Sequence, residues 1–267
     1  MKTVLLLVHD DAGQEARLQA ALDVTRAVEG HLKCVDVSVM PALAGNVYST
    51  LGETMLLADK CEQETQNRIG LERRLAREGV SWDWTDCIGA IAPVLEEASA
   101  LADLIVVNRA LEGFPLPDMR RIAGDLVVRS GKPILAVPED TRGVNFCGDV
   151  MVCWDGSACS VSAMRAAVPL LQLAATVTLF EIDDDGRGSS IGDAAEYLSR
   201  HGIHAKLRQC HARTRPAGDI ILDAVRHDDA DYVVMGGFSH LRFTEALFGG
   251  ATRTMLRQSP VPIFMAH

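Results

Sequence analysis

The chain carries the same short strand-like segment twice, and this repeat limits the folds that it can adopt. Ala102–Val107 (Ala-Asp-Leu-Ile-Val-Val) recurs as Ala230–Met235 (Ala-Asp-Tyr-Val-Val-Met) within a chain of 267 residues. Short apolar runs rich in β-branched residues predict strands that are buried on both faces, as in parallel sheets. The recurrence indicates two similar halves, each long enough to bury its own core.

Matching elements flank both copies of the repeat. Val4–Val8 followed by Asp10 corresponds to Val150–Cys153 followed by Asp155, and both runs predict first strands. An apolar stripe at helical spacing predicts the first helix; it consists of Leu18, Ala21, Leu22, Thr25 and Val28. The further paired elements are second strands at Leu32–Val39 and Val177–Ile182, helices closed by Gly79 and Gly202, third strands ending near Cys87 and Cys210, third helices at Pro93–Leu101 and Asp219–Arg226, and fifth strands at Ile134–Val137 and Ile263–Ala266.

This alternation of strands and helices predicts an α/β fold with two tandem doubly wound domains, each a five-stranded parallel sheet of the Rossmann-like type. The first domain is expected at residues 1–140 and the second at 148–267, joined by a polar linker over Glu139–Gly148. Met40–Glu53 is expected to be a loop over the strand ends, and Pro169 a kink or early end in the helix over Ser160–Leu173. The two apolar fifth strands are expected to pack together, because each would otherwise leave an exposed edge.

Charge and composition exclude several classes of function. The net charge of −10 disfavours a nucleic-acid-binding surface, which needs clustered Lys and Arg. No apolar run approaches the ~20 residues that span a bilayer, and Val4–Val8 is too short for a signal peptide. The seven scattered cysteines are typical of free thiols in a reducing compartment. We therefore expect a cytoplasmic protein that binds neither nucleic acid nor membrane.

Glycines follow the second copy of the repeat at positions where a phosphate could bind. Gly236 comes directly after a buried strand, and Gly249 and Gly250 open the last helix. Amide groups at a helix N-terminus favour an anion, and ligands of open α/β sheets bind at the carboxyl ends of the strands. The alternative is that these glycines serve only as turns.

Other sites receive little support from the sequence. Neither a Gly-x-Gly-x-x-Gly nor a P-loop motif occurs after the first strands, which argues against a dinucleotide dehydrogenase and a P-loop NTPase. His201, His204, Cys210 and His211 cluster in sequence, but a strand spreads its residues by ~3.3 Å each, too far to share one zinc ion. No nucleophile with a nearby general base is recognisable, so neither a catalytic residue nor a metal site is predicted.

The order of these features resembles the universal stress protein family (UspA superfamily), in tandem form and over essentially the whole chain. Val-Cys-Trp-Asp155-Gly156-Ser157 is similar to the opening strand and loop of that family, and the ending Pro260–His267 is similar to its close. Nucleotide-binding members carry Gly-x2-Gly-x9-Gly-Ser/Thr after the fourth strand. Gly236 and Gly249 match the first and third glycines, whereas Ser239 stands at the second and Gly250 stands where Ser or Thr is usual.

The resemblance implies an adenine-nucleotide site (ATP, ADP or AMP, with or without Mg²⁺) in the second domain. Its expected residues are Asp155 against the adenine, Met235, Gly236, Ser239, His240, Gly249, Gly250 and Thr252. Asp155 could instead, or in addition, cap the following helix. In the first domain Asn108 replaces the first glycine, and Pro115 and Pro117 remove amide donors, so no ATP site is expected there.

The predicted function is therefore that of a stress-response protein of the universal stress protein type. The family acts mainly through protein partners, and the resemblance implies slow ATP hydrolysis at most. The alternative is a non-nucleotide interaction or small-ligand module, and the pocket of the first domain is expected to hold an apolar ligand or none. Since single-domain relatives dimerise through the fifth strand, the tandem chain resembles a covalently joined dimer, and whether two chains pair further stays open.

Overall fold

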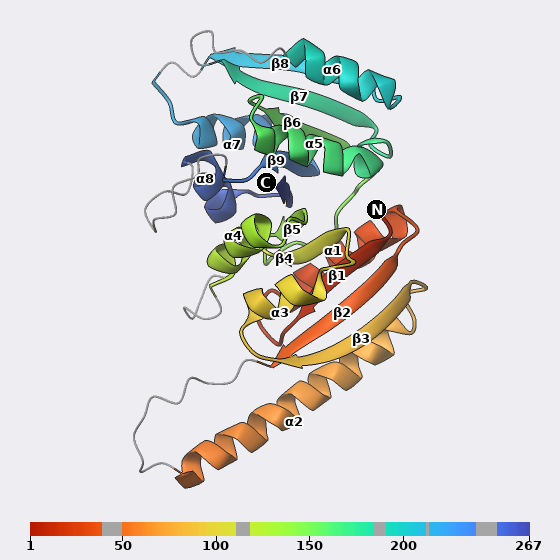
Figure 1. Cartoon of the computed structure of the whole chain (residues 1–267), viewed down its shortest axis with the longest axis vertical. Coiled ribbons are helices and arrows are strands. Elements are labelled where there is room, and N and C mark those ends of the chain that lie inside the picture. Colours follow the sequence, from red (N-terminus) through yellow and green to blue (C-terminus); the bar gives the residue numbers. More distant parts are fainter. Residues whose placement is uncertain (39–49, 111–117, 184–190, 212–213, 239–249) are drawn as a thin grey trace.

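The computed structural model describes the chain except for residues 39–49, 111–117, 184–190, 212–213 and 239–249 (Figure 1). The elements of the first half are β1 Thr3–Val8, α1 Gln14–Ala27, β2 His31–Ser38, α2 Thr50–Leu75, β3 Ser81–Ile88, α3 Ile91–Ala98, β4 Leu104–Asn108, α4 Met119–Arg129 and β5 Ile134–Val137. Those of the second half are β6 Asp149–Trp154, α5 Ala158–Leu171, β7 Thr176–Asp183, α6 Ile191–Arg200, β8 Lys206–His211, α7 Ala217–His227, β9 Tyr232–Gly236, α8 Gly250–Gln258 and β10 Ile263–Ala266.

All ten strands form one continuous sheet in the order β3-β2-β1-β4-β5-β10-β9-β6-β7-β8. Each half contributes five parallel strands with the same relative order, which confirms the predicted α/β class. The two halves join through antiparallel pairing of β5 with β10, where Phe264 lies opposite Leu135. The prediction that the two fifth strands meet is therefore confirmed, and the pairing buries both apolar edges.

Helices cover both faces of the sheet, and the core is correspondingly divided into two layers. The layer beneath α1, α2, α5 and α6 contains side chains such as Leu6, Leu22 and Val152. The layer beneath α3, α4, α7 and α8 contains Leu5, Leu126 and Met255. Successive strand residues alternate between the layers because side chains of a strand point to opposite faces. The apolar runs noted in the sequence are therefore buried on both sides.

Two glycines end helices in the way that the sequence predicts. Gly79 follows α2 with φ +69°, and Gly202 follows α6 with φ +78°. A left-handed conformation at the end of a helix favours glycine because it has no Cβ. At Gly202 the next amide, that of Ile203, donates to the carbonyl of Leu198 at 3.0 Å and closes the turn.

Three details of the predicted elements are wrong or incomplete. The segment Met40–Glu53 is not all loop, because α2 begins at Thr50; residues 40–49 lie outside the described part of the chain. Helix α3 begins at Ile91, so Pro93 lies inside its first turn, where a missing N–H costs nothing. Helix α5 continues through Pro169 and ends at Leu171.

The linker between the halves packs against both of them, although its composition is polar. Within it, Phe146 is buried and packs on the ring of Tyr232, with 5.2 Å between the ring centroids. The amide of Val144 donates to the Asp23 carboxylate at 2.9 Å. The linker is therefore attached to both halves. Among the helices of the described chain, none combines the length and apolar character needed to cross a bilayer.

Candidate functional site

The candidate site lies at the carboxyl ends of β6 and β9, where the helices α5 and α8 begin. This is the edge at which open α/β sheets bind their ligands. Of the predicted site residues, the structure describes Asp155, Met235, Gly236, Gly250 and Thr252. The predictions for Ser239, His240 and Gly249 lie outside the described residues.

Asp155 follows β6 with an exposed side chain, and its carboxylate binds the adjacent loop. Its Oδ1 accepts a hydrogen bond from the amide of Ser157 at 2.9 Å. The helix cap is a different residue, since Ser157 Oγ accepts from the amide of Ser160 at 3.1 Å. The expectation that Asp155 caps α5 is therefore wrong, because Ser157 stands at the N-cap position. The second carboxylate oxygen of Asp155 has no hydrogen bond among the described residues.

Gly236 is the last residue of β9 and lies against the first turn of α5. A Cβ at this position would come within 2.6 Å of the Ser160 nitrogen and 2.7 Å of the Cys159 carbonyl carbon. These are backbone atoms, so no side-chain movement could relieve the contact. The glycine is required for close packing of helix on strand, which is a role in the fold itself.

Gly250 and Thr252 belong to the first turn of α8. Gly250 is the first residue of the helix, and a Cβ there would meet no atom of the described residues within 4 Å. Thr252 is buried, with 5% of its surface exposed, and its side chain packs inward. Met235 is also buried, in the core layer beneath α8. Gly250 is therefore the one of these three residues whose surroundings are open.

Two buried polar groups adjoin this edge and were not singled out as site residues. The indole N–H of Trp154 is buried and has no hydrogen-bond partner among the described residues, while the ring packs in the core. The thiol of Cys159 lies 3.4 Å from Nδ1 of His267, which is 3.0 Å from the Gly237 carbonyl oxygen. Burial, and then the Asp155 carboxylate, raise the pKa of Cys159. The thiol is thus held in its neutral form, which is a poor nucleophile.

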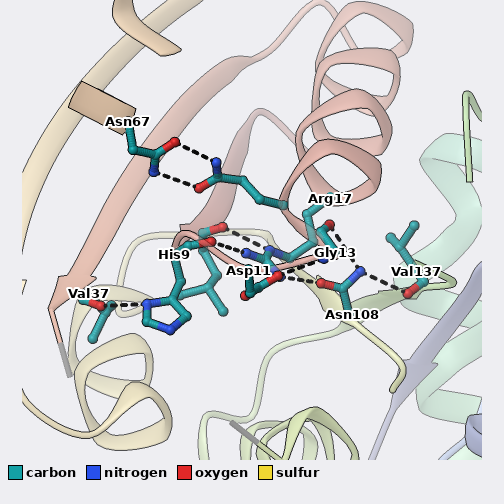
Figure 2. Close-up of polar contacts among 10 residues, drawn as sticks. His9, Asp11, Gly13, Arg17, Val37, Asn67, Asn108 and Val137 are labelled. Carbon is teal, nitrogen blue, oxygen red and sulfur yellow. Dashed lines mark hydrogen bonds and ion pairs between the residues drawn. The ribbon is translucent and has the colours of Figure 1, made fainter. Parts of the chain in front are cut away.

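The corresponding edge of the first half is filled by its own side chains (Figure 2). The guanidinium of Arg17 lies between β1 and β4, with none of its side chain exposed. It donates from Nε to the Leu7 carbonyl at 3.2 Å, from Nη1 to Asp11 Oδ1 at 2.9 Å and from Nη2 to the His9 carbonyl at 2.9 Å. Nη1 also donates to the side chain of Asn108.

Asn108 completes this network from the end of β4. Its Nδ2 donates to the carbonyls of Gly13 and Val137, at 3.3 Å each. Gly13 lies so close that a Cβ on it would be 2.4 Å from Asn108 Oδ1. Asn108 and Gly236 occupy equivalent positions, because each ends the fourth strand of its half. The side chain of Asn108 occupies the space that, beside Gly236, is taken by the backbone of α5.

The strand register corrects one correspondence between the halves. Val4 pairs with Leu104 and Val150 pairs with Tyr232, so Val4 and Val150 are equivalent positions in the two halves. By this register the residue equivalent to Asp155 is His9 and not Asp10. The first-half loop from β1 to the N-cap at Gly13 is longer than the loop from β6 to the N-cap at Ser157. Asp11, in this longer loop, supplies the carboxylate that pairs with Arg17. The sequence offered one signal for this network, since Arg17 lies four residues before Ala21 on the apolar stripe.

Acidic side chains gather at the ends of β2 and β3 as well. Asp36 is 9% exposed, and burial, followed by Asp86 and Glu64, raises its pKa to about 6. The positive charge of Arg68, which also pairs with Asp86, opposes this effect. Nowhere in the described part of the chain do three His, Cys, Asp or Glu residues converge as metal ligands. The ring of His201 packs at a tilted angle against Tyr197, with 4.7 Å between the ring centroids.

A separate hollow of about 470 Å³ lies at the opposite, amino ends of the strands. Its walls include Thr176, Lys206 and Arg208, and Arg208 pairs with Asp228 beside α7. Because this hollow lies at the amino ends of the strands, and the candidate site at their carboxyl ends, the two are distinct.

Comparison with known proteins places these features in a family. The model of the Universal stress protein family matches residues 148–267. A universal stress protein from Archaeoglobus fulgidus is similar in structure, with a TM-score of 0.77, 16% identity, and coverage of 99% of this chain and 97% of that chain. A functionally unknown protein from Pseudomonas aeruginosa has a TM-score of 0.60 at 16% identity, covering 98% and 91%.

No curated protein sequence matches the chain significantly. At 16% identity the two structural similarities establish the fold, and they extend over both halves. The similarity to a family rests on the match of residues 148–267. Residues 148–267 thus match the universal stress protein family as a domain, and a first half of the same fold precedes that domain.

Proposed function

We propose that the second half binds one adenine nucleotide per chain, at the carboxyl ends of β6 and β9. The observation that carries this proposal is the start of α8, where no atom of the described residues lies within 4 Å of the Cβ position of Gly250. Free amides at a helix N-terminus, together with the helix dipole, attract a phosphate group. Asp155 extends an exposed carboxylate from the neighbouring strand end, with one oxygen available to the base.

We further propose two domains, residues 1–140 and 148–267, of which only the second binds nucleotide. In the first, Arg17, Asp11 and Asn108 bind one another where a ligand would lie. The role would be that of a cytoplasmic stress-response protein whose partners respond to nucleotide occupancy. The competing role is an interaction module without nucleotide, and the packing of Gly236 against α5 favours it, because it explains that glycine without a ligand.

A single amide separates these two functions. Gly250→Pro removes one N–H at the first position of α8, where proline is well tolerated. Gly250→Ala keeps the N–H and places its Cβ in open space. Loss of one hydrogen bond to a charged phosphate costs ~1.5–3 kcal/mol, so we expect Gly250→Pro to weaken ATP binding by about tenfold to a hundredfold.

The measurement is calorimetric titration of each purified protein with ATP. Nucleotide binding predicts near-wild-type affinity for Gly250→Ala and a clear loss for Gly250→Pro. Equal affinities of both variants would exclude a phosphate at the start of α8. A wild-type chain that releases no heat would favour the interaction module.

A further inference from the structure

One side chain of the first half contacts the last helix of the second half. Arg109 follows β4 directly, and its amide donates to the Val137 carbonyl at 2.9 Å. Its side chain crosses the seam between β5 and β10 and donates from Nη1 to the carbonyls of Arg257 at 2.7 Å and Leu256 at 3.3 Å. Both carbonyls belong to the last turn of α8.

This contact meets a need of the helix. The last four carbonyls of an α-helix have no partner within it, and they carry the negative end of the helix dipole. Arg109 binds two of these carbonyls and brings a positive charge to that end. Since α8 has only nine residues, it has few internal hydrogen bonds and depends on such outside contacts.

The residue equivalent to Arg109 in the second half cannot form such a contact with α4. Gly237 takes the position of Arg109 in the second half, since its amide donates to the Ala266 carbonyl at 2.9 Å. A Cβ on Gly237 would lie 3.1 Å from Cγ1 of Val127 in α4, so α4 packs closely on the glycine. The first half thus contributes an arginine that binds α8, whereas at the equivalent position the second half has a glycine on which α4 packs.

We propose that Arg109 is a positioning residue, through which the first half holds α8 in place and so orients the phosphate-binding start of that helix. The second part of this inference rests on the nucleotide function proposed above. The first part, the clamp on α8, stands on the hydrogen bonds alone. This clamp would give the first half a structural role in the second, although side chains of the first half occupy its own candidate ligand site.

The experiment compares three full-length variants by amide hydrogen exchange, with ATP titration as a second readout. Arg109→Met removes both hydrogen bonds and the charge, and Arg109→Lys keeps a cation that can reach one carbonyl. Arg121→Met is the matched control, since this arginine of α4 is 74% exposed. A cation at a helix C-terminus contributes ~0.3–2 kcal/mol, so we expect amides of α8 to exchange roughly twofold to thirtyfold faster in Arg109→Met.

The expected pattern is local. Exchange in α8 rises in Arg109→Met, rises less in Arg109→Lys, stays unchanged in Arg121→Met, and is unaffected in β1 and β2 of all three. Unchanged exchange in α8 overturns the clamp, and so does an equal rise throughout the chain, because that would be a general loss of stability. If Arg109→Met does not fold, the same comparison is made on Arg109→Lys.

The ATP readout separates the two proposals. Weaker ATP binding by Arg109→Met, in step with faster exchange of α8, supports the positioning role. If the wild-type chain binds no ATP, the proposed function fails, and the exchange data decide the clamp on their own. If ATP binds equally well to both proteins while α8 exchanges faster, the clamp on α8 is supported and the orienting role of Arg109 is overturned.

Discussion

The guanidinium of Arg17 and the carboxylate of Asp11 lie 2.9 Å apart, and 0% and 9% of the two side chains are exposed. Burial lowers the pKa of Arg17, and the charge and hydrogen bond of Asp11 oppose this effect. The pair therefore compensates a cation in the interior of the first half. Asp11 Oδ1 also accepts a hydrogen bond from the amide of Gly13 at 2.8 Å, whereas the buried Oδ2 has no hydrogen-bond partner among the described residues, so Arg17 supplies the only opposing charge that the described structure brings to this carboxylate.

Replacing Arg17 by Met should destabilise the chain strongly. The change leaves the Asp11 carboxylate buried and unpaired, which typically costs ~3–5 kcal/mol. Urea unfolding followed by circular dichroism measures the loss. The double variant Arg17→Met/Asp11→Asn removes the stranded charge and should recover a large part of it. A loss below ~1 kcal/mol in the single variant would mean that the pair is exposed to water in solution.

Alanine at two glycines of the candidate site should have opposite effects on stability. Gly236→Ala forces a Cβ to within 2.6 Å of the Ser160 nitrogen, and we expect it to destabilise the chain by ~1–3 kcal/mol. Gly250→Ala enters open space in a helix and should be neutral or stabilising by up to ~1 kcal/mol. Thermal unfolding of both variants checks this. Equal melting temperatures would show that α5 can move away from β9.

The packing of Gly236 against α5 limits which variants can test nucleotide binding. A bulky residue at Gly236 would disturb the packing of α5, so a loss of binding in such a variant could not be assigned to the site. Gly250→Pro with its alanine control is the cleaner pair.

Stability should depend on pH through Asp36. Its folded pKa of about 6 lies above the ~3.9 of an unfolded aspartate, so the folded chain binds more protons between these values. Ionisation of Asp36 therefore removes stability as the pH rises from about 4 to about 6. Asp36→Asn should gain ~1–3 kcal/mol relative to wild type at pH 8 compared with pH 4. The exposed Asp140→Asn is the control, and parallel stability profiles for Asp36→Asn and wild type would refute the assignment.

Thiol reactivity should distinguish the cysteines. Cys147 is exposed, whereas Cys34 is buried and its pKa is raised to about 12 by burial, with Asp83 and Asp36 adding to the effect. Burial likewise raises the pKa of Cys153 to about 12. At pH 8 such a rise lowers the thiolate fraction about a thousandfold, so iodoacetamide should label Cys147 long before Cys34 or Cys153. Peptide mass spectrometry measures the order, and simultaneous labelling would contradict it.

Much of the fold could be predicted from the sequence because buried parallel strands leave a strong apolar signal. The fifth strands at Ile134–Val137 and Ile263–Ala266 were predicted with their observed bounds. Element starts were predicted less well. Proline is acceptable in the first turn of a helix as well as before it, so Pro93 could not fix the start of α3.

The roles of single site residues were harder to predict, because they depend on what lies opposite in space. A glycine after a strand has the same sequence signal whether a phosphate or the backbone of α5 lies against it. The capping role expected for Asp155 belongs to Ser157, because both residue types can bind either loop or helix amides. An arginine on a helix is usually exposed, and its position beside the apolar stripe is a weak signal; Arg17 is buried because α1 packs directly on β1 and β4.

We propose that the chain holds one nucleotide, in the second half alone. The most direct measurement is the stoichiometry of ATP binding to the wild-type chain by isothermal titration calorimetry. We expect one ATP per chain, and the same stoichiometry in the Arg17→Met/Asp11→Asn variant, whose change lies in the first half. Two sites per chain, or no binding at saturating ATP, would contradict it.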